Sequence, residues 1–174
     1  VLPADLGPLT VTLDIEAGSV VSPTIFVLLA DTAAAQSLPT GLLPIGSMFE
    51  VSAHDEGELT SGVAVQEANV TKPLRLVINY TSANAPHPAS LRLVRWDGAT
   101  QSWTDAGITL LGNDTVARKL TVQVDETGTF ALVTTNQAPT ANGVAAVVTP
   151  EDTAYVFKPA DFPYADADGD HLAG

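Results

Sequence analysis

Cysteine is absent from the 174 residues of this sequence, and its absence excludes several kinds of site. Without a thiol the chain forms no disulfide, holds no metal through sulfur and has no cysteine nucleophile. The compartment stays open, because many exported bacterial proteins also lack cysteine.

Basic residues are scarce as well. The chain has 7 Lys and Arg against 20 Asp and Glu, which gives a net charge of −13. Nucleic acids and anionic membrane surfaces need clustered cations, so both are disfavoured as partners. The excess of carboxylates fits a soluble, self-repelling chain or one that collects divalent cations. For most of these carboxylates, solubility is the simpler explanation.

Long hydrophobic runs and aromatic residues are also few. No run reaches the roughly 18 apolar residues of a membrane span. Only 6% of residues are aromatic although 45% are hydrophobic, so we expect a packed core built mainly of Val, Leu, Ile and Ala. No signal peptide is visible and the sequence starts at Val1, which favours a mature or excised piece of a larger precursor.

Catalytic motifs are missing too. The three histidines, His54, His87 and His171, are scattered, and no HxxxH or HExxH spacing occurs. There is no GxSxG elbow and no glycine-rich phosphate loop. We therefore expect a protein that is not an enzyme.

The sequence does contain a regular series of strand patterns. Short runs of alternating or continuous apolar residues recur every 8–15 residues, with almost no helical periodicity. They lie at 8–15, 24–29, 48–53, 60–65, 73–80, 90–96, 101–103, 108–111, 119–124 and 129–134. Turns are expected at 97–98, 112–114 and 126–128, and a loop at 39–44. This pattern predicts an all-β fold, an antiparallel β-sandwich over 1–135.

Residues 136–174 have a different character. A polar linker that contains Pro139 precedes two short apolar runs at 144–148 and 154–157, read as strands, and an acidic cluster follows. So short a segment has too little apolar surface to offset its own ordering entropy. We expect an incomplete Ig-like or cadherin-like β module that another part of a longer chain, the preceding domain or another molecule completes.

Residues 1–135 resemble a sandwich domain of bacterial surface proteins that is related to the ZU5 group. The resemblance is carried by LRLVINY at 74–80, LRLVRWD at 91–97, Trp103 and GTFALV at 128–133, with IEAGSV at 15–20 similar to an upstream segment of that group. Some relatives cleave themselves at a His-Phe-Ser motif just before the closing strand. That motif is absent at 126–130, so the resemblance does not imply self-cleavage here.

Residues 136–174 resemble the start of a bacterial cadherin-like tandem repeat. The resembling positions are NQAP at 136–139, PEDT at 150–153, Phe162 and DADGD at 166–170. Such repeats form strings in adhesins, and related modules often bind calcium near their junctions.

The acidic cluster is a candidate calcium site. Alternating carboxylates can converge on one hard cation that takes six to eight oxygen ligands, and the spacing is not that of an EF-hand. The alternative is an acidic loop that binds nothing. The candidate ligands are Asp166, Asp168 and Asp170, with Glu151, Asp152 and Asn136 as additional donors.

Two tryptophans flank the predicted Asp97-Gly98 hairpin turn. Trp96 and Trp103, together with Tyr80, are candidates for stacking on sugar rings. The interpretation that we favour is structural, with the indoles capping the core or pairing across strands.

Three sequons, at Asn69, Asn79 and Asn113, are candidate glycosylation sites. Asn79 lies inside a predicted strand, so Asn113, in a predicted turn, and Asn69 are the better candidates.

The leading hypothesis is a non-enzymatic structural module of an extracellular or cell-surface assembly, an adhesin repeat or a filament subunit. We expect its partners to be copies of itself or neighbouring modules of the same chain, joined when residues in 138–160 add a strand to another sheet. The alternative is a carbohydrate-binding accessory module of a larger secreted protein, with surface glycans as partners.

Overall fold

The chain divides into two compact units. The computed structural model describes residues 2–31, 37–56, 70–81, 85, 87–136, 138–143, 146, 148–158 and 161–166. Unit 1 is Val1–Thr135 and unit 2 is Asn136–Gly174, so the boundary lies at the polar linker. The predicted strand at 60–65 lies outside the described residues.

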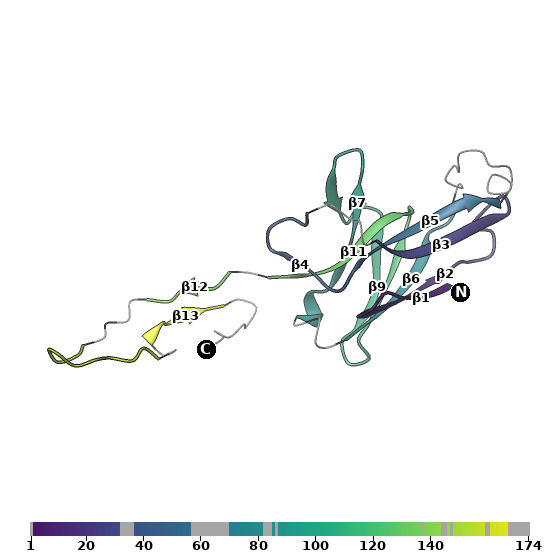
Figure 1. Ribbon diagram of the computed structural model, residues 1–174. Coiled ribbons are helices and arrows are strands. Elements are labelled where there is room, and N and C mark those ends of the chain that lie inside the picture. Colours follow the sequence, from purple (N-terminus) through teal and green to yellow (C-terminus); the bar gives the residue numbers. More distant parts are fainter. Residues whose placement is uncertain are drawn as a thin grey trace. The chain divides into compact units, whose positions relative to one another are not determined.

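Unit 1 contains two antiparallel sheets (Figure 1). The first has five strands in the order β1-β2-β6-β10-β9. Their bounds are β1 Leu2–Asp5, β2 Leu9–Asp14, β6 Leu74–Tyr80, β9 Ile108–Asp114 and β10 Lys119–Val124. Together, the two sheets confirm the predicted antiparallel β-sandwich.

The second sheet has six strands. Its order is β3-β5-β11-β7-β8, and β4 pairs with the C-terminal end of β11. The bounds are β3 Thr24–Asp31, β4 Leu42–Pro44, β5 Met48–Asp55, β7 Arg92–Asp97, β8 Ser102–Thr104 and β11 Gly128–Thr135. A short 3-10 helix, η2 (Pro88–Ser90), precedes β7.

The main core lies between the two sheets. β1 lies beside β3 and β9 lies beside β7, so corresponding ends of the sheets face each other. Phe49 and Phe130 stack at the centre, with ring centroids 5.7 Å apart. Aliphatic side chains from β2, β6 and β10 pack against them, as the low aromatic content predicts.

Strand β6 illustrates why the alternating pattern folds in this way. Leu74, Leu76, Ile78 and Tyr80 are buried, and the residues between them face outward or are half-buried. Successive side chains on a strand point to opposite faces, so a period of two buries one face and leaves the other in water.

The six-stranded sheet also buries side chains on its outer face. Val94, Ala131 and Val133 form a second apolar cluster there. Leu38, Leu42, Met48 and Trp103 pack against it. The segment that leads into β4 therefore covers part of this face, and β11 is buried on both sides.

Two strands of unit 1 do not appear among the predicted ones. β1 contains Pro3, and β4 lies inside the predicted 39–44 loop. β1 is at the edge of its sheet, where a proline costs no ladder hydrogen bond if its ring faces away from the partner strand. β4 has only three residues, and its pairing with β11 decides its conformation.

The predicted turn at 112–114 is wrong. β9 continues to Asp114, and the turn follows at 115–118. Asp114 Oδ1 accepts hydrogen bonds from the backbone N–H of Val116 (3.1 Å) and Ala117 (2.8 Å), which fixes the start of the turn. The register between β9 and β10 shifts at Leu111, so the extra residue is absorbed by a β-bulge instead of by the turn.

Unit 2 has little regular structure in its described residues. β12 (Thr140–Ala141) pairs with β13 (Tyr164–Ala165) in an antiparallel two-stranded sheet. Residues 154–157 are not in a strand, so that prediction is wrong for the chain by itself. Of the predicted strand at 144–148, residues 144, 145 and 147 lie outside the described residues.

Candidate functional site

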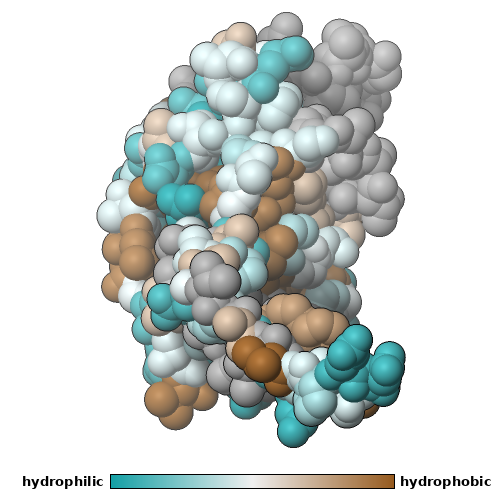
Figure 2. Space-filling view, turned by 90° about the vertical axis from the view of Figure 1, so that its left-hand side faces the viewer, coloured by the Kyte–Doolittle hydropathy of each residue, from teal (hydrophilic) through white to brown (hydrophobic). Residues whose placement is uncertain are grey.

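Large hydrophobic side chains reach the surface of the described part of the chain (Figure 2). Single exposed apolar residues are normal on a protein surface, so their position matters more than their number. Two groups have a position that bears on function. One lies on an edge strand of unit 1 and the other on the strand-free segment of unit 2.

The edge strand β9 leaves a core-facing leucine uncovered. Leu110 pairs directly with Val122, so both side chains point to the core side of the sheet. Val122 is 1% exposed, whereas Leu110 is 58% exposed. At the corresponding end of the other sheet stands β8, which has only three residues. β7 of the opposite sheet lies beside β9, yet the core-facing side chain of Leu110 stays largely in water.

The backbone of β9 is also open on one side. Among the described residues, β9 pairs with β10 and with no other strand. An edge strand presents a row of N–H and C=O groups that can pair with another chain. Leu111, at the bulge, is 50% exposed. Apolar side chains and unpaired backbone groups thus occur on the same strand.

Unit 2 contains an exposed segment that carries apolar side chains and belongs to no sheet. All described residues from 148 to 158 are exposed. Val148 is 91% exposed and Val156 is 78% exposed. Apolar side chains in such numbers on a segment without a sheet partner are costly to leave in water. Residues 153–157 of this segment have side chains typical of a strand but belong to no sheet, and a turn at Glu151 and Asp152 precedes them.

A small aromatic cluster orders one end of this segment. The Phe157 ring lies 5.6 Å from both Tyr155 and Phe162, measured between centroids. Asp161 Oδ2 accepts hydrogen bonds from the Lys158 backbone N–H (2.7 Å) and from the Tyr155 hydroxyl (2.8 Å). The bond from Lys158, and to a smaller extent the bond from Tyr155, holds the pKa of the Asp161 carboxyl below its usual range.

The candidate calcium ligands are only partly described. Asp166 is half-buried, while Glu151 and Asp152 are exposed in a turn. Asp168 and Asp170 lie outside the described residues. Within the described part of the chain, no three acidic or histidine side chains gather in a way that would hold a metal ion. Calcium binding therefore stays a prediction that depends on Asp168 and Asp170.

Of the three aromatic residues proposed for sugar stacking, the two tryptophans lie together and Tyr80 lies apart from them. Trp96 and Trp103 pair across the β7–β8 hairpin in an edge-to-face contact with centroids 5.6 Å apart. Tyr80 belongs to the other sheet and is buried in the core. Burial, and then the charge of Asp114, raises the pKa of its hydroxyl. Tyr80 is therefore unsuited to contact a glycan.

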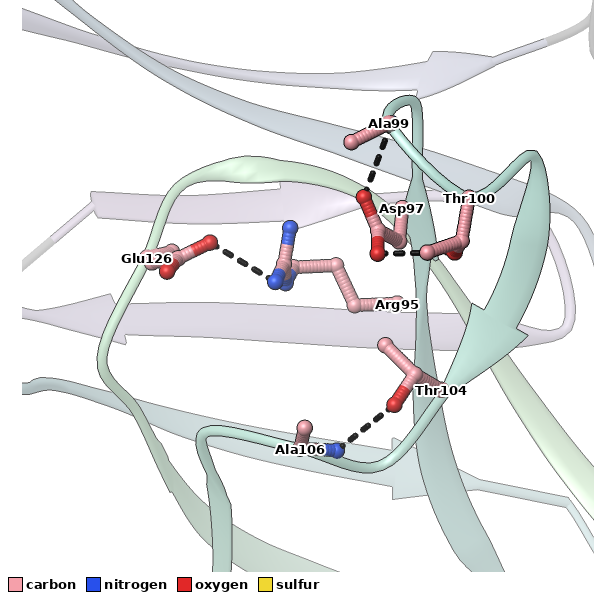
Figure 3. Close-up of polar contacts among 7 residues, drawn as sticks. All are labelled: Arg95, Asp97, Ala99, Thr100, Thr104, Ala106 and Glu126. Atoms are coloured by element: carbon pink, nitrogen blue, oxygen red, sulfur yellow. Dashed lines mark hydrogen bonds and ion pairs between the residues drawn. The ribbon is translucent and has the colours of Figure 1, made fainter.

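The turn between β7 and β8 is built around Asp97 (Figure 3). Its carboxylate accepts hydrogen bonds from the Thr100 hydroxyl (2.8 Å) and from the Ala99 backbone N–H (2.9 Å). Nearby, Arg95 forms an ion pair with Glu126 at 2.7 Å, just before β11 begins. These contacts fix the hairpin that carries both indoles.

The Asp97 contacts make a testable contribution to stability that depends on pH. The hydrogen bond from Thr100, and then that from Ala99, lowers the pKa of the Asp97 carboxyl in the folded state. A lowered pKa stabilises the fold above the unfolded value of about 3.9, and this contribution is lost as the pH falls further. Asp97→Asn should therefore lower the thermal midpoint at pH 7, and the gap to the wild type should shrink at pH 3.

The matched control for that experiment is Asp125→Asn, which changes an exposed aspartate outside the turn. Its effect on the midpoint should be smaller than that of Asp97→Asn at pH 7. A gap between Asp97→Asn and the wild type that is the same at both pH values would contradict the assignment.

Of the two preferred sequon residues, Asn113 lies within the described part of the chain and Asn69 lies outside it. Asn113 is half-buried within β9 instead of in a turn. Its Nδ2 donates a 2.7 Å hydrogen bond to the Pro88 carbonyl oxygen. A glycan at this nitrogen would replace that bond and would need space that the Pro88 backbone occupies.

Comparison of the chain with protein-family models and with curated proteins finds no match. The resemblances to ZU5-related and cadherin-like modules therefore stay predictions. Among the described residues, no helix is long and apolar enough to cross a membrane.

Proposed function

We propose that this protein is a non-enzymatic building block of an extracellular or cell-surface assembly, in which residues of 138–160 from one subunit add a strand to a neighbouring subunit. The observation that carries the proposal is the exposure of Leu110 on the core side of the sandwich, next to the fully covered Val122. A strand laid along β9 would pair with its open backbone and cover Leu110.

The segment 148–158 supplies the matching half of the contact. Its apolar side chains are exposed, and its described residues belong to no sheet. Binding as a strand would pair the backbone of residues 153–158 and would bury Val156 when its side chain faces Leu110. Extended segments that pair with a sheet edge gain affinity from main-chain hydrogen bonds and specificity from alternate side chains.

The geometry of such a contact favours a fibre over a closed dimer. The donor segment and the acceptor edge are different surfaces of the same chain, so the contact is heterologous. Heterologous contacts propagate as open filaments unless the rotation between subunits closes a ring. The strongly acidic chain limits unspecific association, so specific strand addition would dominate assembly.

The substitution Leu110→Lys tests the acceptor edge. The charged side chain would lie under the incoming strand, where it would lose water without gaining a partner. We expect the concentration needed for assembly to rise at least about tenfold, because a cost of about 1.4 kcal/mol already changes an association constant by that factor. Light scattering over a concentration series measures the effect.

Val116→Lys is the matched control. Val116 is 93% exposed and lies in the turn after β9, outside the strand that would be paired. The Val116→Lys variant should assemble like the wild type. Both lysine variants should unfold at temperatures near that of the wild type. If Leu110→Lys assembles at the same concentration as Val116→Lys, β9 is not the acceptor edge.

A further inference from the structure

The β7–β8 hairpin also forms one wall of a pocket. The pocket lies on the outer face of the six-stranded sheet and has a volume of about 410 Å³. Its opposite wall is the 39–42 segment that leads into β4. The volume lies within the range of roughly 300–1,000 Å³ that is typical of small-molecule sites.

The side chains of the hairpin wall alternate as strand geometry requires. Arg92 and Val94 lie two residues apart on β7, and Trp103 and Asp105 lie two apart on and just after β8. Trp103 is directly opposite Trp96, so all of these positions share the outer face. One face of a two-stranded ribbon thus presents a guanidinium, an indole and a carboxylate to the pocket.

The two charged side chains of the pocket are not used elsewhere in the described part of the fold. Arg92 and Asp105 are exposed, and no ion pair of either residue with another described residue is found. Trp103 is half-buried against the outer-face cluster, which holds its ring in place. The backbone around the pocket is fixed by pairing of β4 with β11 and of β7 with β8. The pocket is therefore preformed, and its charged groups are available to a ligand.

We propose that this pocket binds a neutral carbohydrate unit. Sugars present apolar C–H faces and many hydroxyl groups, and an indole beside a hydrogen-bond donor and an acceptor matches both features. Arg92 donates to hydroxyl oxygens and Asp105 accepts from hydroxyl groups. Thr104 and Thr135 add hydroxyls that can do either. The single positive and single negative charge cancel, so the pocket favours a ligand without net charge.

This site differs from the set of aromatic residues singled out in the sequence. The pocket is lined by Trp103, Arg92 and Asp105, whereas Tyr80 and Trp96 are not among its lining residues. It is independent of strand addition at β9, because β9 contributes no residue to the pocket. Sugar binding and assembly can therefore fail separately.

Titration with neutral sugars followed by amide and indole N–H NMR tests the proposal. The probes are glucose, galactose, mannose and N-acetylglucosamine, each raised to tens of millimolar. We expect at least one of them to cause saturable shifts confined to the pocket residues, with the Trp103 indole among them. Arg92→Ala and Asp105→Asn should each weaken binding of that sugar at least tenfold. Both residues are exposed, so neither change should unfold the protein.

Arg75→Ala is the matched control, because Arg75 is an arginine of the other sheet that pairs with Asp14. It should bind the sugar like the wild type. The proposal is overturned if no probe gives saturable shifts in the pocket, or if Arg92→Ala binds as tightly as Arg75→Ala. A sulfated sugar that binds more tightly to Asp105→Asn than to the wild type would instead show an anion site, and would overturn the neutral-ligand assignment.

Discussion

A chain that ends at Asn136 is expected to stay folded and monomeric at concentrations at which the full chain assembles. Unit 1 is compact by itself and contains the whole core between the two sheets. Removing 137–174 takes away the proposed donor segment but no strand of the sandwich. Light scattering should give the mass of one chain, and circular dichroism should still show strand structure with a cooperative thermal transition.

A second truncation makes this result specific. A chain that ends at residue 160 loses β13 but keeps the proposed donor segment, and it should still assemble. If the chain that ends at Asn136 assembles as the full chain does, strand donation from 138–160 is refuted. If both truncated chains are monomeric, β13 or the residues after it are needed, and the donor has been placed in the wrong segment.

Replacing Phe130 by alanine is expected to cost about 3–5 kcal/mol of folding free energy. Phe130 is fully buried, and its ring stacks on Phe49 at the centre of the core. Its removal takes away the transfer free energy of the ring and leaves a cavity between two sheets that can relax only in part. Domains of this size are stable by about 5–15 kcal/mol, so much of the margin would be lost.

Chemical denaturation followed by circular dichroism measures that loss. Phe157→Ala is the matched control, because Phe157 is an exposed phenylalanine of unit 2. It should leave the unfolding midpoint of the sandwich unchanged. A loss of less than 1 kcal/mol for Phe130→Ala would mean that the two sheets do not pack around this ring.

The sandwich could be predicted because local patterns dominate its central strands. In β6 the alternation of apolar side chains determines which face is buried, and Tyr80 follows Leu74, Leu76 and Ile78 onto that face. The same alternation argues against a role for Tyr80 in binding sugars at the surface. The edge strands are less predictable from the sequence. Pairing with distant segments, and not local composition, determines where β1, β4 and the end of β9 form.

The candidate sites were less predictable for a related reason. That Leu110 is uncovered depends on how the opposite sheet packs against β9, and nothing in the sequence around 110 contains that information. The pocket beside Trp103 likewise needs Arg92 and the 39–42 segment to meet on one face. The signal that could have revealed part of it was the alternation of Arg92, Val94 and Trp96, which places the guanidinium and the indoles on one side of the hairpin.

Cross-linking between introduced cysteines tests strand addition most directly. The chain has no cysteine of its own, so a thiol cross-link that forms in a Thr109→Cys/Val156→Cys variant and in neither single variant reports contact between β9 and the donor segment. With a short bifunctional thiol reagent, we expect a ladder of covalent multimers from this double variant and none from either single variant. Links confined within one chain, or no links at all in assembled material, would contradict the proposal that these subunits join by strand addition.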